Sequence, residues 1–192
     1  MISKEKTKMA LEKMYAMFPD AVGELEHQTP FQLLIAVILS AQATDVSVNK
    51  VTPHLFAAYP NAEQLANAPL ETITEYIRTI GLYRNKAKNI KRCAQQIMEE
   101  FDGNVPETRE ELMRLAGVGR KTANVVLGDA FNTPAIAVDT HVERVSKRLR
   151  ICKLDASVSE VEETLMRKVP KEDWVKMHHT MIFFGRYHCT AR

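Results

Sequence analysis

Apolar residues recur along the chain at the three- and four-residue spacing of helices, and little sustained two-residue alternation indicates strands. The segment from residue 31 to 41 is almost uniformly apolar, which predicts a helix buried on all sides. Before it, Thr29-Pro30-Phe31-Gln32 combines a capping box with proline at the first helical position. We therefore expect an all-α fold with this helix in its core.

Capping residues, prolines and glycines mark the other helices, which bring the total to about ten. They are predicted near residues 45–57, 62–67, 70–79, 84–101, 109–116, 120–131 and 140–149, after Ser157, and from 171 to Gly185. Pro53 falls inside the first of these and should bend that helix or delay its start, because proline removes one ladder hydrogen bond. Gly185 is predicted to end the last one.

Composition places the chain among globular proteins. Of its 192 residues, 45% are apolar and 26% charged, which is outside the range of disordered sequences. Its three cysteines, Cys93, Cys152 and Cys189, fit neither a disulfide framework nor a complete zinc or iron site, so we expect a reducing compartment. The longest apolar stretch falls short of the ~20 residues that span a bilayer, and no secretory signal is visible, which argues against a membrane or secreted protein.

The net charge of +2 says little about partners, but its distribution says more. Residues 76–150 hold 14 basic and 9 acidic residues. Within them, the run from Tyr76 to Met98 has no acid and six bases: Arg78, Arg84, Lys86, Lys88, Lys91 and Arg92. Such a density suits a phosphate backbone, but a solvated helix face is the simpler interpretation of the run taken alone.

Two glycines separated by one residue join the helices predicted on either side of residues 117–119. A phosphate-binding P-loop needs glycine immediately before its lysine, where Arg120 stands. A dinucleotide fingerprint needs a preceding strand and a third glycine, where Thr122 stands. A helix-hairpin-helix remains, in which the amides of Gly117, Val118 and Gly119 point at a phosphate, with Arg120 adding charge. The alternative is an ordinary turn between two helices.

Lys121 lies in the first turn of the second helix, where the positive end of the helix dipole disfavours another positive charge. If the site is also partly desolvated, the neutral amine becomes available as a nucleophile. Lys121 could instead contact a phosphate as a point charge.

Asp139 follows a short apolar segment, residues 135–138, and precedes a basic helix. We interpret it first as an N-cap, and a carboxylate fixed in this way could also stabilise positive charge that develops during a reaction. His141, on the same helix, is interpreted as a core residue or a phosphate contact. The pattern does not favour a zinc site, because adjacent histidines should point to different faces of a helix. The residues considered for it were His178, His179, His188 and Cys189.

These residues resemble the endonuclease III family of helix-hairpin-helix DNA glycosylases. The resemblance rests on residues 115–127 and 134–142 and extends through 34–45, 80–83 and 185–189, nearly the whole chain. It implies two helical domains with a DNA cleft between them. One is a six-helix domain at 22–132 with the helix-hairpin-helix at 109–130, and the other is discontinuous, from 1–21 and 133–192.

The resemblance also implies a bifunctional enzyme of base-excision DNA repair. Lys121 is then the nucleophile that removes an oxidised pyrimidine and cuts the abasic site by β-elimination through a Schiff base, and Asp139 is the assisting carboxylate. The positions of Gln42 and Leu82 serve as the wedge that fills the space left by the extruded base. From the residues alone, Gln42 is a helix-end residue and Leu82 a core leucine.

Two positions depart from the family pattern. The family usually has proline where Ala116 stands, which should leave the entry to the hairpin less stiff. It also carries a four-cysteine [4Fe-4S] loop that begins at the position of Cys189, and this chain ends three residues later. One ligand cannot hold a cluster, so we expect a truncated chain without the cluster that a full-length protein would carry. Cys93 and Cys152 are interpreted as buried thiols.

The expected partner is duplex DNA with a damaged base or an abasic site, bound by a monomer in the cytoplasm, at the bacterial nucleoid, with no membrane involved. One alternative is a monofunctional glycosylase of the same superfamily, such as the adenine-removing branch, which lacks lysine at the position of Lys121. Another is a non-catalytic module that binds DNA or senses damage.

Overall fold

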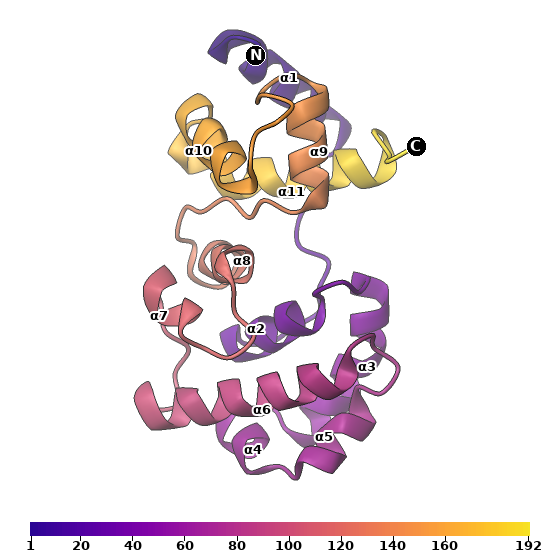
Figure 1. The fold of residues 1–192 in the computed structure, drawn as a ribbon, viewed down its shortest axis with the longest axis vertical. Helices are drawn as coiled ribbons and strands as arrows, with labels where there is room; N and C mark the ends of the chain where they lie inside the picture. Colours follow the sequence, from indigo (N-terminus) through magenta and orange to yellow (C-terminus); the bar gives the residue numbers. More distant parts are fainter. The chain divides into compact units, whose positions relative to one another are not determined.

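The computed structural model describes residues 1–192, and its regular secondary structure is entirely helical, which confirms the expected all-α class (Figure 1). The helices, in chain order, are α1 (Lys4–Met17), α2 (Pro30–Leu39), α3 (Asp45–Ala58), α4 (Ala62–Asn67), α5 (Leu70–Tyr76), α6 (Tyr83–Glu100), α7 (Arg109–Met113), α8 (Arg120–Phe131), α9 (Thr140–Arg148), α10 (Val158–Lys168), the 3-10 helix η1 (Lys171–Asp173) and α11 (Trp174–Tyr187). None of them is both long and apolar enough to cross a membrane.

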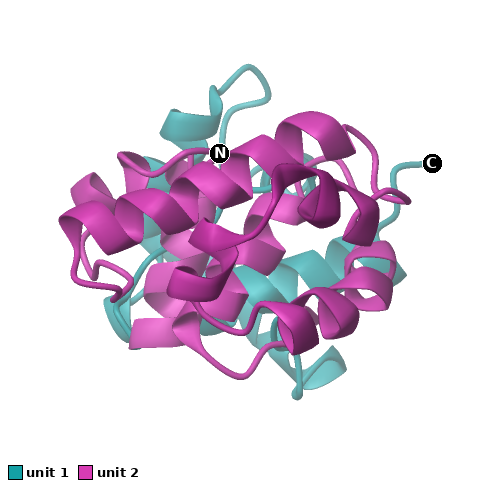
Figure 2. Ribbon diagram, turned by 90° about the horizontal axis from the view of Figure 1, so that it is seen from below, with its two compact units in different colours: residues 1–23, 132–192 teal, residues 24–131 magenta.

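The helices form two compact units (Figure 2). The first unit combines Met1–Gly23 with Asn132–Arg192 and contains α1 and α9 to α11. The second unit is continuous, Glu24–Phe131, and contains α2 to α8. Each unit has buried apolar side chains of its own, as expected for chain segments of this length.

The second unit is built around α2. Thr29 caps this helix by accepting a hydrogen bond from the amide of Gln32 at 3.2 Å, and Pro30 occupies the first helical position, as predicted. Every residue from Phe31 to Leu39 is buried. Helices α3, α6 and α8 pack against α2, which accounts for its lack of a polar face.

In the first unit, α9 packs against α11, and Gly185 makes this contact possible. We predicted that Gly185 ends the last helix, but α11 continues to Tyr187. A Cβ atom on Gly185 would lie 3.0 Å from Cβ of His141 and 3.2 Å from Cγ2 of Val145. The glycine therefore brings two helices close together and does not terminate one of them.

Other helix boundaries differ for reasons of burial. Helix α3 begins at Asp45 and continues through Pro53, so the proline does not delay its start. Helix α5 ends at Tyr76, three residues earlier than predicted, because the following chain turns to bury Ile77 and Ile80. In that turn the amide of Ile80 donates to the carbonyl of Ile77 at 2.9 Å.

Candidate functional site

The hairpin between α7 and α8 depends on glycine at one of its two positions. Gly117 has a φ of +79°, and a Cβ atom there would lie 3.1 Å from Cγ2 of Ile38 and 3.2 Å from Cβ of Asn89. A side chain there would be strained by the left-handed backbone and would force these neighbours to shift. Gly119 has no such restriction, since a Cβ atom there would have nothing within 4 Å. The protein's own packing therefore requires Gly117, whereas Gly119 leaves open space beside the backbone.

Val118 differs from the prediction that all three hairpin amides point outward. Its side chain is buried, and its amide donates to the carbonyl of Leu115 at 3.2 Å. The turn itself uses this donor, because the chain needs an i→i−3 bond to reverse direction between the helices. Of the three residues, Gly117 and Gly119 are the exposed ones.

Ala116 shows how the hairpin entry is held where the family usually has proline. Its amide donates to Oε1 of Gln96 at 2.8 Å, and Nε2 of Gln96 donates to the carbonyl of Arg114 at 3.1 Å. Proline has no amide hydrogen and could not make the first of these bonds. The side chain of Gln96 thus fixes the segment that leads into the hairpin.

Lys121 is the second residue of α8 and is exposed, as is Arg120 before it. The partial burial that the sequence argument required is absent. The placement at a helix N-terminus is as predicted, and it leaves the amine accessible to a bound substrate.

Asp139 is the N-cap of α9, as predicted. Its Oδ1 accepts a hydrogen bond from the amide of Val142 at 2.8 Å. The preceding residues, Ala135 to Val138, are buried, and the amide of Ala137 donates to Nδ1 of His178 at 3.2 Å. Asp139 is therefore a half-buried carboxylate at the end of a well-anchored segment.

His141 lies two residues further on and is half-buried. Burial lowers its pKa below the usual 6.5, the charges of Arg144 and Arg186 lower it further, and the charge of Asp139 opposes them. Nη2 of Arg144 lies 3.2 Å from Nδ1 of His141. Since arginine can only donate, Nδ1 is the acceptor and the imidazole is neutral.

Gln42 and Leu82 share an unusual backbone conformation. Gln42 lies in the turn between α2 and α3 with a φ of +56°, and Leu82 is the N-cap of α6 with a φ of +61°. Both are exposed, and 60% of Leu82 is accessible. The interpretation of Leu82 as a core residue, drawn from the residues alone, is wrong. Left-handed backbone at a bulky residue is uncommon and persists only where the surrounding structure determines it.

The basic run on α6 is less available to a nucleic acid than its sequence indicates. Nζ of Lys86 donates to the carbonyls of Leu39 and Ala41, and Nζ of Lys91 donates to those of Ala66 and Ala68. Both lysines thus cap the C-terminal ends of neighbouring helices. The interpretation of the run as suited to a phosphate backbone is wrong for these two positions.

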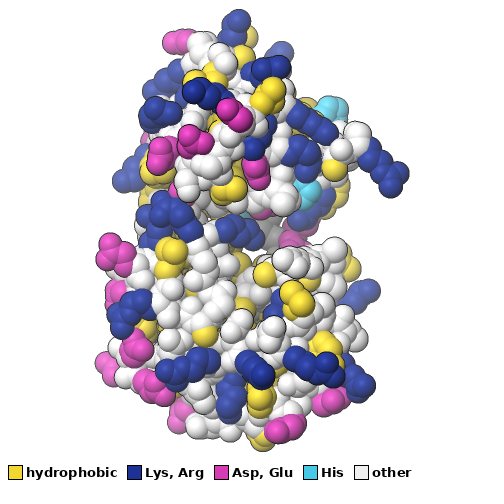
Figure 3. Space-filling view, in the orientation of Figure 1, with side chains coloured by type: hydrophobic (Ala, Val, Ile, Leu, Met, Phe, Trp, Pro, Cys, Tyr) yellow, Lys and Arg dark blue, Asp and Glu magenta, His cyan; other side chains and the backbone are white.

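Two further bases of the run are engaged in ion pairs. Arg92 lies 3.3 Å from Glu99, and Arg78 lies 3.6 Å from Glu75. Over the face drawn in Figure 3, Lys and Arg side chains are interspersed with Asp and Glu. The excess of basic over acidic residues in 76–150 therefore does not indicate a continuous basic patch.

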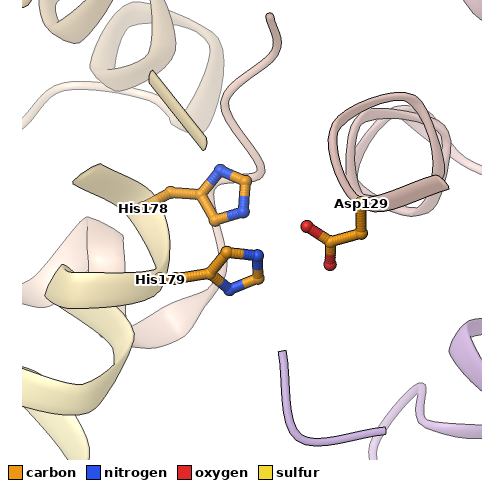
Figure 4. A group of neighbouring side chains, drawn as sticks. All are labelled: Asp129, His178 and His179. Atoms are coloured by element: carbon orange, nitrogen blue, oxygen red, sulfur yellow. The ribbon is translucent and has the colours of Figure 1, made fainter. Parts of the chain in front are cut away.

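His178 and His179 lie side by side on α11, both buried (Figure 4). Their ring centroids are 4.3 Å apart. The expectation that adjacent histidines point to different faces is wrong here, because the two rings lie together on one side of α11. Nδ1 of His178 accepts from the amide of Ala137, which gives this residue a structural role.

Comparison with known proteins assigns these features to a family. The model of the HhH-GPD superfamily of base excision DNA repair proteins matches residues 35–171. The chain belongs to this family. It is 57% identical over 192 residues to endonuclease III of Bacillus subtilis (strain 168), a match that covers 100% of this chain and 88% of that protein. It is 46% identical over 191 residues to endonuclease III of Escherichia coli (strain K12), covering 100% and 90%.

Solved structures agree. A trapped endonuclease III–DNA covalent intermediate and a non-covalent endonuclease III–DNA complex each match with a TM-score of 0.98 and 57% identity, over 100% of this chain and 90% of theirs. A thermostable thymine-DNA glycosylase shares the fold, with a TM-score of 0.86 at 23% identity. The resemblance to endonuclease III is confirmed, and the protein is a DNA glycosylase/AP lyase of base-excision repair.

Membership of the endonuclease III family implies a [4Fe-4S] cluster across the family, and the cysteines of this chain do not provide its ligand set. Cys93 and Cys152 are buried in the cores of separate units, as predicted, and burial raises the pKa of Cys93 to about 12 and also raises that of Cys152. Only Cys189 is partly exposed, with its Sγ 3.5 Å from Nη1 of Arg148. One accessible thiol does not meet the requirement for four.

Proposed function

We propose that this enzyme removes oxidised pyrimidines from duplex DNA and then cuts the strand at the resulting abasic site, with Lys121 as the nucleophile. The observation that carries this proposal is the exposed amine of Lys121 in the first turn of α8, directly after the hairpin. A relative of 57% identity has been captured in a covalent intermediate with DNA, which supports the same kind of chemistry here.

The proposed reaction begins with attack of the Lys121 amine on C1′ of the damaged nucleotide. The bond between C1′ and the base breaks, and the base leaves with the electron pair and takes up a proton. Opening of the sugar ring gives an imine between Nζ and C1′. The protonated imine acidifies the hydrogen on C2′, and loss of that proton expels the 3′-phosphate by β-elimination. Water then hydrolyses the imine and releases the amine.

Asp139 is proposed as the carboxylate that assists departure of the base and the later proton transfers. Its hydrogen bond from the Val142 amide limits the rotation of the carboxylate. A fixed negative charge stabilises the positive charge that develops on the sugar as the base leaves.

DNA binding is proposed to use the hairpin and two wedge residues. The amides of Gly117 and Gly119, at the positive end of α8, suit a backbone phosphate, with Arg120 alongside. Gln42 has the polarity to pair with the orphaned base, and the exposed Leu82 has the apolar surface to fill the space left in the stack.

Borohydride trapping tests the proposal. Borohydride delivers hydride to the imine carbon and leaves a stable secondary amine, so protein incubated with a duplex that contains an oxidised thymine should become linked to DNA. Lys121→Ala should abolish the linked product, and Lys13→Ala, which removes an exposed lysine of α1, should leave it unchanged. A linked product that persists in Lys121→Ala would contradict the assignment.

The same assay separates the alternatives. Release of the base without strand cleavage or a linked product would indicate a monofunctional glycosylase. Binding to abasic duplex without either reaction would indicate a non-catalytic module.

A further inference from the structure

Lys86 connects the turns that carry the two proposed wedge residues. It is only 5% exposed, although it stands among exposed residues near the start of α6. Its Nζ donates to the carbonyl of Leu39 at 2.9 Å and to that of Ala41, the residue before Gln42, at 2.7 Å. Its own amide donates to the carbonyl of Leu82 at 3.0 Å. One residue therefore contacts the backbone of both turns.

Each of the two turns contains a residue with left-handed backbone, which surrounding contacts must hold in place. Gln42 and Leu82 each adopt a positive φ, a conformation that costs free energy in residues other than glycine. Such a conformation persists only where surrounding contacts determine it. Lys86 donates hydrogen bonds to the carbonyl of Ala41, next to Gln42, and to the carbonyl of Leu82.

We propose that Lys86 is a positioning residue that holds Gln42 and Leu82 at a fixed separation, so that both enter the DNA stack together when the damaged base leaves it. This inference rests on the wedge role assigned under the proposed function. Lys86 does not touch the reacting atoms. It acts by removing freedom from the wedge before DNA binds, which lowers the cost of base extrusion.

Lys91 provides a matched control on the same helix. It also caps a helix, since its Nζ donates to the carbonyls of Ala66 and Ala68 at the end of α4. These acceptors belong to neither wedge turn. Lys86→Met and Lys91→Met each remove one ammonium group from two carbonyls and keep a side chain of similar length. A purely structural role predicts that the loss in either variant does not depend on the substrate.

The two variants should differ on substrates that require base extrusion. With an oxidised thymine paired in duplex DNA, Lys86→Met should lower kcat/KM by about 100-fold relative to Lys91→Met, the effect expected of a displacement of about 1 Å in a positioned group. On a preformed abasic site in single-stranded DNA, where no base leaves a stack, the two should cleave at similar rates. Equal losses in both variants, or a loss in Lys86→Met that is the same on both substrates, would overturn the inference.

A second variant covers failure to fold. Lys86→Gln keeps a hydrogen-bond donor on a shorter side chain and should reach only one of the two carbonyls, with a smaller loss confined to the duplex. A folded Lys86→Gln with wild-type activity on the duplex would also overturn the inference.

A binding measurement separates this inference from the proposed function. In a duplex with 2-aminopurine opposite a stable abasic analogue, insertion of the wedge should unstack the fluorescent base and raise its emission. Wild type and Lys91→Met should give this signal and Lys86→Met should lose most of it. If wild type forms no borohydride-linked product, the proposed function fails, and the fluorescence still decides the role of Lys86.

Discussion

Gly117 lies directly against Ile38, so close that a Cβ atom on the glycine would force the isoleucine to shift. Such an atom would be 3.1 Å from Cγ2 of Ile38, on a backbone with a φ of +79°. Ile38 belongs to α2, in which every residue from Phe31 to Leu39 is buried, so the hairpin turn packs onto the core of its unit.

Substitution of the two hairpin glycines should therefore give different results. Gly117→Ala should lower the free energy of unfolding by about 1–2 kcal/mol from the left-handed backbone alone, with a further loss from the contact with Ile38. Gly119→Ala should change it by less than about 1 kcal/mol, because the added carbon meets nothing within 4 Å. Urea denaturation measures both.

Gly119 should matter more for DNA binding than for stability. If the open space beside Gly119 receives a phosphate, Gly119→Ala should weaken binding to duplex DNA while the fold stays intact. Unchanged affinity in Gly119→Ala would contradict the role of this glycine in binding.

Leu82 should show a conflict between stability and activity. Leu82→Asn should raise the free energy of unfolding by roughly 1 kcal/mol, because asparagine tolerates left-handed backbone and the lost leucine is 60% exposed. Leu82→Ala removes the same apolar side chain without easing the backbone, so it should not stabilise the protein. Both variants should lose activity on damaged duplex. Thermal unfolding and single-turnover kinetics check the pair, and equal stabilities would show that the backbone is unstrained.

His141 predicts a dependence of stability on pH. Burial and neighbouring arginines lower its pKa from 6.5 in the folded protein, so the unfolded chain binds more protons in the pH range just below 6.5. The stability contributed by neutral His141 is complete above that value and decreases as the pH falls below it. His141→Gln should make the melting temperature less dependent on pH in this range than it is in wild type. His54→Gln, at an exposed position of α3, should keep the wild-type dependence.

Thiol reactivity should distinguish the three cysteines. Cys93 and Cys152 are buried with raised pKa values, whereas Cys189 is partly exposed. In the native protein iodoacetamide should modify Cys189 alone, and all three should react after denaturation. Mass mapping of the modified peptides decides this, with Cys189→Ser as the unreactive control. Rapid modification of Cys93 would show that its unit opens readily.

Much of the fold was predictable because local signals and burial agree. The Thr29 cap with Pro30, the cap by Asp139 and the capping box of Ser157 all occur where the sequence predicts them. Errors arose where a contact distant in sequence decides the outcome. Gly185 resembles a helix end until His141 is known to lie against it, which no local pattern reveals.

For the candidate site, the sequence indicated the positions of some residues and not of others. Motif spacing singled out Lys121 and Asp139 as candidates, and the structure places both at helix N-termini, as the sequence predicts. The exposure of Leu82 could not be inferred from its neighbours, because a leucine between apolar residues ordinarily faces the core. The capping roles of Lys86 and Lys91 depend on carbonyls at least 23 residues away in the chain, and no sequence signal indicates them.

The capping lysines of α6 also bear on how salt should affect DNA binding. Binding to DNA weakens at high salt to the extent that cationic side chains displace condensed counterions from the phosphates. Lys86 and Lys91 donate to helix carbonyls, and Arg78 and Arg92 pair with carboxylates. Of the six bases in the run, only Arg84 and Lys88 can therefore displace counterions without first losing a carbonyl or carboxylate partner. The affinity of this enzyme for DNA should therefore tolerate salt better than its run of basic residues indicates.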